Sequence, residues 1–171
     1  KNDEILVPSL TFIGTVNPII NSSAIPHFVE VDEKTFGIDC DKLFEYLKKK
    51  NYTKNKITYN KTTKRKISAI IIVHVMGHAA NIVGVKKIAK KFNLKVIEDA
   101  AECIGSFSKK KHLGTFSEIG VISFNGNKTI TTGGGGVVLT QKKNLAKEAR
   151  HLIQNAKLPH KWEYFHDKVA N

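Results

Sequence analysis

The stretch Ile67–Val75 constrains the fold of this chain more than any other part of its sequence. It reads Ile-Ser-Ala-Ile-Ile-Ile-Val-His-Val, so apolar and mostly β-branched residues follow one another without regular polar alternation. A run of this kind is typical of a strand that is covered on both faces, as strands of parallel sheets are. Helices usually supply that cover, and the stretch therefore predicts an α/β fold.

Shorter strand and helix patterns alternate along the rest of the chain. Further strands are predicted at 5–7, 27–31, 94–97, 121–124 and 137–140. Helices are predicted at 9–20 with Ser9 or Thr11 as the cap, at 39–47 beginning with Asp39 or Asp41, at 85–92 and at about 142–154. This alternation predicts a mainly parallel sheet with helices on both faces.

Length and composition narrow the class of protein. The 171 residues suffice for one domain with a hydrophobic core but not for two large ones. Because no apolar run reaches the length of a bilayer span and residues 1–4 show no signal-peptide pattern, we expect a cytoplasmic protein. Cys40 and Cys103 stand far apart without CxxC neighbours, so we expect no metal site, and the sequence leaves a disulfide undecided.

The net charge of +13 is concentrated in the Lys/Asn-rich segment 48–66, which contains nine basic residues and no acid. We interpret the segment as a surface insertion whose charges face solvent. The alternative is a basic module that binds polyanions such as nucleic acid. Aromatic residues are not regularly spaced on a recognisable platform there, which favours the first interpretation. We therefore expect neither nucleic acid nor a membrane among the partners.

Asp99 follows directly after the apolar residues of the strand predicted at 94–97. In open α/β sheets, polar residues at the carboxyl ends of strands face the ligand crevice. A carboxylate in this place could pair with the ring nitrogen of pyridoxal phosphate (PLP), which makes the ring an electron sink. The alternative is that Asp99 caps a short helix beginning at Ala100-Ala101.

Lys128 lies among glycines and short polar side chains, five residues after Ser123 at the end of another predicted strand. A partly desolvated lysine loses its proton readily and can form a Schiff base. A hydroxyl and an amine at this spacing could reach the phosphate and the aldehyde of one PLP molecule. The run Gly133–Gly136 could bring backbone N–H groups close to a ligand, or could simply form a hairpin between two strands.

Several motifs of the chain resemble one family. They are Pro8-Ser9-Leu10-Thr11-Phe12, His74-Val75-x-Gly77, Glu98-Asp99-Ala100-Ala101, Gly114-Thr115-Phe116, Ser123-Phe124-x-x-x-Lys128-x-Ile130-Thr131-x-Gly133-x-Gly135-Gly136 and His166-Asp167. Together they resemble the DegT/DnrJ/EryC1/StrS sugar aminotransferases over nearly the whole chain, apart from 48–66. The resemblance implies the aspartate aminotransferase-like fold (PLP fold type I), PLP as cofactor, and amino transfer from L-glutamate to a keto sugar on a nucleotide.

The resemblance also implies roles for single residues. Lys128 would be the Schiff-base lysine, Asp99 the partner of the ring nitrogen, and Ser123 a phosphate ligand. Phe12 would stack on the ring, although a core position is its alternative role. Glu102 stands where the family often has Gln or His beside the phenolic oxygen of the cofactor. Dehydrases of the family carry histidine in place of the lysine, so Lys128 favours transamination.

Resemblance further suggests the subgroup and the extent of the protein. The sequences of segments 123–136 and 160–164 are similar to those of enzymes that act on C4 of UDP-linked 4-keto-6-deoxy N-acetyl sugars for surface glycans. Residues 1–171 would be a partial PLP-binding large domain, incomplete at both ends and without the C-terminal small domain. A homodimer with shared active sites is expected. A non-catalytic PLP-fold binding or regulatory protein is the alternative. His74 and His78 are expected to be turn residues or to support the site residues from behind.

Overall fold

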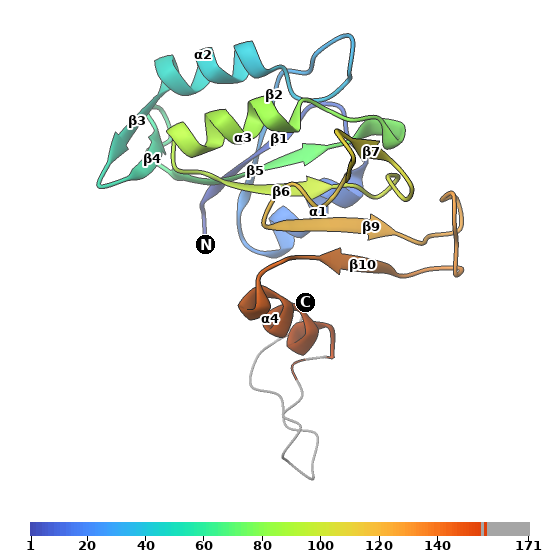
Figure 1. Cartoon of the computed structure of the whole chain (residues 1–171). Coiled ribbons are helices and arrows are strands. Elements are labelled where there is room, and N and C mark those ends of the chain that lie inside the picture. Colours follow the sequence, from blue (N-terminus) through green and yellow to red (C-terminus); the bar gives the residue numbers. More distant parts are fainter. Residues whose placement is uncertain (155, 157–171) are drawn as a thin grey trace.

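The computed structural model describes residues 1–154 and 156, so the motifs at 160–164 and His166-Asp167 lie outside the described part. The main sheet has the strand order β10-β9-β6-β5-β1-β2 (Figure 1). These strands are β1 (Glu4–Pro8), β2 (Ile25–Val29), β5 (Lys66–Val73), β6 (Lys95–Asp99), β9 (Ile119–Ser123) and β10 (Gly136–Leu139). All neighbours in this order pair in parallel except β10, which runs antiparallel to β9.

β5 lies inside the sheet and is covered on both faces, as its sequence predicts. Ile70 and Ile72 are fully buried in a cluster with residues of α2 (Cys40–Lys50) and α3 (Ile82–Lys91). Ile71 faces the other way and packs with Ile19 of α1 (Ile13–Asn21). Figure 1 shows α2 and α3 together on one side of the sheet. The predicted α/β fold with a mainly parallel sheet and helices on both faces is therefore confirmed.

The helix starts follow local hydrogen bonding. Asp39 caps α2, because its side chain accepts hydrogen bonds from the backbone N–H groups of Asp41 and Lys42. The predicted caps of α1 are wrong: the helix begins at Ile13, after Phe12, and no side chain caps it. The Thr11 hydroxyl instead lies 2.7 Å from that of Thr15.

The segment 48–66 is more ordered than its composition suggested. After the end of α2 it forms a hairpin of β3 (Asn51–Lys54) and β4 (Ile57–Asn60), and β4 pairs with the first residues of β5. Asn51, Thr58 and Asn60 are buried. The sequence did not indicate the hairpin because polar residues occupy its buried positions. The Thr58 hydroxyl, for example, donates to the carbonyl of Phe92 at 2.6 Å.

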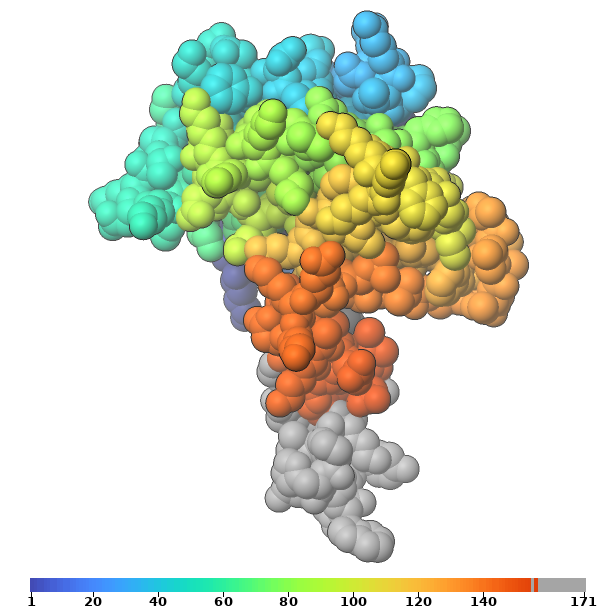
Figure 2. All heavy atoms as spheres, viewed as in Figure 1, coloured from blue at the N-terminus to red at the C-terminus, as the bar shows by residue number. Residues whose placement is uncertain are grey.

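Smaller elements complete the described part. These are the turn η1 (Val75–Gly77), the two-residue strands β7 (Phe107–Ser108) and β8 (Lys111–His112), and α4 (Lys143–Ile153). The segment 124–135, which joins β9 to β10, forms one edge of the molecule and is orange in Figure 2. Within residues 1–154, no helix has both the length and the apolar character needed to cross a bilayer.

Thr58→Val tests whether the hairpin belongs to the folded core. Removing the hydroxyl leaves the Phe92 carbonyl without its partner in a buried place, so we expect the free energy of unfolding to fall by about 1–2 kcal/mol. Denaturant unfolding of the full-length protein measures this change. Thr62→Val is the matched control, because Thr62 is exposed and its hydroxyl takes part in none of the hydrogen bonds described, and it should change the free energy by about 0.5 kcal/mol or less. Equal effects of the two variants would contradict the packing described here.

Candidate active site

Polar side chains gather at the carboxyl ends of the parallel strands, where ligands bind in folds of this kind. Asp99 ends β6 and Ser123 ends β9. Asp99 pairs in register with Val121, two residues before Ser123. Side chains alternate along a strand, so Asp99 and Ser123 lie on the same face of the sheet. This is the face that α1 covers.

Asp99 is held by two donors. Its Oδ2 accepts a hydrogen bond from the hydroxyl of Thr15 at 2.5 Å, and its Oδ1 accepts one from the backbone N–H of Ala101 at 3.1 Å. The residues after Asp99 form a turn and not a helix, so the alternative role of Asp99 as a helix cap is wrong. Thr15, which is 6% exposed, was missed by the sequence analysis. Nothing in its local sequence indicates a partner so far along the chain.

Lys128 and Glu102 form an ion pair. The Nζ of Lys128 lies 3.3 Å from Oε1 of Glu102, and the lysine side chain is only 15% exposed. The other carboxylate oxygen of Glu102 accepts a hydrogen bond from the backbone N–H of Met76 at 2.9 Å. Met76 belongs to the turn that follows β5 and has a φ of 51°. Glu102 therefore connects the lysine to the end of the central strand.

Ser123 stands beside the turn that follows Asp99. Its N–H donates to the carbonyl of Ala101 at 3.3 Å, and its hydroxyl accepts from the N–H of Asn125 at 3.2 Å. Beyond it, the run Gly133–Gly136 leads into β10, which pairs with β9. The glycines thus form part of a hairpin connection, as the simpler of the two interpretations predicts. Positive φ angles of 83° at Gly133 and 90° at Gly135 explain why glycine is needed there.

Phe12 lies at the start of α1 with 79% of its surface exposed. Its ring passes close to Gly14, where a Cβ atom would meet a ring carbon at 3.0 Å. The alternative of a core position for Phe12 is therefore wrong. The aromatic face is open to a ligand or to another protein segment.

The hydrogen bonds described link the five predicted residues through Thr15 and the turn after Asp99, and Glu102 and Lys128 form an ion pair. Phe12 and Thr15 share the first turn of α1, and Thr15 binds Asp99. The turn after Asp99 carries the carbonyl that Ser123 contacts and, one residue later, Glu102 with its partner Lys128. The structure thus gathers a ring, a carboxylate, a hydroxyl and the amine of a lysine whose side chain is 15% exposed at one edge of the sheet. These are the groups that PLP requires of a protein.

A second carboxylate, Glu98, anchors this edge from the opposite face. Glu98 and His74 are fully buried, and their Oε2 and Nε2 atoms lie 3.2 Å apart. The Nδ1 of His74 accepts from the N–H of Ala80, so its hydrogen is on Nε2 and the imidazole is neutral. Glu98 also accepts from the N–H of Gly114 at 2.8 Å and from the N–H and hydroxyl of Ser117, both at 2.6 Å.

Burial would raise the pKa of Glu98, but the hydrogen bonds from His74, Ser117 and Gly114 outweigh burial and lower the pKa below its ordinary value. His74 is thus a buried partner of Glu98, whereas His78 is exposed. Glu98 was overlooked as an anchor because its partners are between 16 and 24 residues away. Gly120, which pairs in register with Glu98, lets the loop approach closely, because a Cβ atom there would collide with the Gly114 carbonyl at 1.9 Å.

The cysteines take no part in the site. Both are free, and Cys103 is buried. Burial, together with the charges of Asp99, Glu102 and Glu98, raises the pKa of the Cys103 thiol to about 12. Among the described residues, no group of His, Cys, Asp and Glu side chains could hold a metal ion.

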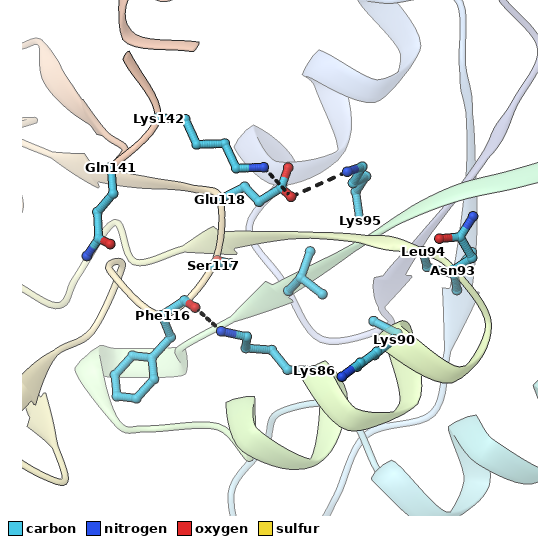
Figure 3. Close-up of a pocket in the computed structure, with 12 residues that line it drawn as sticks. Lys86, Lys90, Asn93, Leu94, Lys95, Phe116, Ser117, Glu118, Gln141 and Lys142 are labelled. Carbon is cyan, nitrogen blue, oxygen red and sulfur yellow. Dashed lines mark hydrogen bonds and ion pairs between the residues drawn. The ribbon is translucent and has the colours of Figure 1, made fainter. Parts of the chain in front are cut away.

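A surface hollow of about 580 Å³ lies elsewhere, near the amino ends of β6 and β9 (Figure 3). Lysines from α3, β6 and the start of α4 surround it, and Glu118 pairs with Lys95 at 3.3 Å and with Lys142 at 2.6 Å. None of the five predicted site residues lines it. The groups suited to PLP are therefore at the opposite edge of the sheet from this hollow.

The fold and the groups at its carboxyl edge are those of PLP-dependent aminotransferases of the aspartate aminotransferase fold. Comparison with known proteins agrees. The sequence profile of the DegT/DnrJ/EryC1/StrS aminotransferase family matches residues 1–171. GDP-perosamine synthase of Escherichia coli O157:H7 is 40% identical over 170 residues, which cover 99% of this chain and 42% of that protein.

Two solved structures show the same fold. A DegT DnrJ EryC1 StrS aminotransferase from Brucella abortus superposes with a TM-score of 0.85 at 26% identity, over 99% of this chain and 43% of the other. NtdA from Bacillus subtilis, solved with bound cofactor PMP, has a TM-score of 0.78 at 25% identity, over 100% of this chain and 35% of the other.

The chain belongs to the DegT/DnrJ/EryC1/StrS aminotransferase family. Its predicted membership is confirmed, and PLP is the cofactor of this fold. The chain spans about two-fifths of the length of the curated relative described above, with 42% of that protein covered.

Glu98→Gln tests the anchoring role. At pH 7 we expect the variant to lose about 2–3 kcal/mol of unfolding free energy, because an amide cannot accept all the hydrogen bonds that the carboxylate accepts. An acid with a lowered pKa stabilises the fold above its unfolded value, 4.5, and this stabilisation is lost as the pH falls through the folded value. The difference in melting temperature from the wild type should therefore be large at pH 7 and shrink below pH 4.5.

Glu118→Gln serves as the control for this experiment. Glu118 also has a lowered pKa, caused first by its hydrogen bond with Lys142, but its side chain is 36% exposed. Solvent screens such pairs, so the control should lose only about 1 kcal/mol or less. A Glu98→Gln protein that melts like the wild type at pH 7 would show that Glu98 does not anchor the edge.

Proposed function

We propose that the protein containing this chain transfers an amino group from L-glutamate to the keto carbon, C4, of a nucleotide-linked deoxy sugar used for surface glycans. The observation that carries the proposal is Lys128, whose side chain is only 15% exposed, at the same edge of the sheet as Asp99 and Ser123. Membership of a sugar aminotransferase family supports it. We place the reaction in the cytoplasm, where a nucleotide-linked sugar and free glutamate are both available.

Each residue has a distinct task in this proposal. PLP, when bound, supplies a ring that delocalises the electron pair of the substrate carbon. Asp99 would hold a proton on the ring nitrogen, Ser123 would bind the phosphate, and Phe12 would cover the face of the ring. Lys128 would bond to the cofactor and, once displaced by a substrate amine, would carry the proton between carbon atoms with its Nζ. Glu102 would orient that amine.

Two nucleotides are candidates for the substrate, and an experiment can distinguish them. The E. coli relative is named for a GDP-linked sugar, perosamine, whereas the resemblance of segment 123–136 favours UDP-linked sugars. We propose GDP as the first candidate, because 40% identity extends over nearly the whole chain. Assays of the full-length enzyme with GDP- and UDP-linked 4-keto sugars separate the two. A higher kcat/KM for the UDP sugar would overturn this choice.

We also propose a homodimer with shared active sites. Large apolar side chains are exposed on the segments that build the site: Phe12 and Met76 at 79% each and Ile130 at 55%. Exposed apolar groups that cluster around a site are typical of surfaces that another protein segment covers. Sedimentation of the full-length protein tests the assembly, and a monomer that retains full activity would contradict it.

Lys128 provides the decisive test of the proposed function. We expect the full-length protein with PLP to show a visible absorbance band that L-glutamate bleaches. Borohydride should fix the cofactor on the peptide that contains Lys128. Lys128→Arg should lower kcat by about 10³-fold or more, because arginine neither bonds to PLP nor transfers its proton at neutral pH.

Lys142→Arg is the matched control, since Lys142 lies at the distant hollow with 46% of its side chain exposed. It should keep both the absorbance band and the activity. Cofactor fixed on scattered surface lysines, or an active Lys128→Arg enzyme, would overturn the catalytic assignment.

A further inference from the structure

The hydroxyl of Thr15 contacts Asp99, a residue far from it in the sequence. Its Oγ1 lies 2.5 Å from Oδ2 of Asp99, although 84 residues separate the two in sequence. Thr15 is 6% exposed, and the contact with the half-buried Asp99 is part-buried. A hydrogen bond of this length from a hydroxyl to a carboxylate belongs to the strong, charge-assisted kind.

The direction of this hydrogen bond follows from chemistry. An ionised carboxylate only accepts hydrogen bonds, so Thr15 must donate to Asp99. The oxygen of Thr15 is then free to accept from the hydroxyl of Thr11, which lies 2.7 Å away. Thr11, Thr15 and Asp99 thus form a row in which each hydrogen bond polarises the next. The row begins two residues before α1 and ends at the carboxylate.

The contact restricts how Asp99 can turn. With Oδ2 bound to Thr15 and Oδ1 bound to the N–H of Ala101, both oxygens of the carboxylate are held and its plane is fixed. Each oxygen keeps a second lone pair that can accept from a ligand. Phe12 precedes Thr15 by three residues at the start of the same helix. One turn of α1 therefore sets the position of both the carboxylate and the exposed ring.

We propose that Thr15 is a positioning residue, which holds the Asp99 carboxylate in the orientation that receives the protonated ring nitrogen of PLP. The inference rests on the proposed function, because it assumes that Asp99 meets the cofactor. Thr15 itself touches Asp99 and not the cofactor in this arrangement. Its hydroxyl, and not its methyl group or its place in the helix, performs the task.

Three variants of the full-length protein test this inference. Thr15→Val keeps the shape of the side chain but lacks the hydroxyl, and Thr15→Ser keeps the hydroxyl but lacks the methyl group. Val16→Ala loosens the same helix turn at a buried residue, 6% exposed, whose apolar side chain cannot hydrogen-bond to Asp99. For each protein, PLP titration gives the dissociation constant, and circular dichroism of the visible band reports the orientation of the bound cofactor.

We expect Thr15→Val to raise the dissociation constant of PLP about tenfold or more, as the loss of a hydrogen bond to a charged group does. The circular dichroism of its cofactor band should also change. Thr15→Ser should behave like the wild type in both measurements. Val16→Ala should melt at a lower temperature but keep the wild-type cofactor band.

Three results would overturn the inference while leaving the proposed function intact. They are a Thr15→Val protein with wild-type affinity and circular dichroism, a Thr15→Ser protein as impaired as Thr15→Val, and a Val16→Ala protein with the same altered band as Thr15→Val. In each case the wild type still carries PLP on Lys128. A wild type that does not bind PLP would instead overturn the proposed function, and this inference with it.

Discussion

The buried carboxylate of Glu98 is the constraint on which the carboxyl edge of this sheet depends. Removing an ionised carboxylate from water costs several kcal/mol, on the order of the net stability of a whole domain, unless donors replace the water. Glu98 has four such donors: the imidazole of His74, the N–H of Gly114, and the N–H and hydroxyl of Ser117. The need to satisfy this one charge thus fixes the end of β5 and the loop before β9.

The strand alternation of β6 divides structural and chemical tasks between two neighbouring acids. Successive side chains of a strand point to opposite faces, so Glu98 and Asp99 do so as well. Glu98 faces the side of α2 and α3, where protein donors surround it completely. Asp99 faces α1 and accepts only from Thr15 and Ala101 among the hydrogen bonds described. Glu98 thus has its hydrogen bonds made by donors of the fold, whereas Asp99 keeps lone pairs that can accept from a ligand.

Local patterns determined how much of this could be predicted. The apolar run at Ile67–Val75 predicted the central strand, and Asp39 predicted a helix start, because both signals lie within a few residues. The hairpin at 51–60 was missed since Asn51, Thr58 and Asn60 fill its buried positions with polar groups. Thr15 was missed for a related reason: its hydrogen-bond partner lies 84 residues away, and no local pattern reveals such a partner. Asp99, Ser123 and Lys128 were indicated by their places at strand ends or among glycines, and Phe12 and Glu102 by resemblance, whereas neither approach indicated the supporting residues.

The ion pair of Lys128 with Glu102 is compatible with a reactive amine. Glu102 is 42% exposed, and ion pairs open to solvent contribute only about 1 kcal/mol or less, so a ligand can displace the contact at little cost. Glu102 is itself held in place, because its other carboxylate oxygen accepts a hydrogen bond from the N–H of Met76, in the turn that follows β5. The amine is thereby held near the carboxyl edge by a weak bond to a well-anchored acid. This arrangement orients Lys128 without preventing it from binding something else.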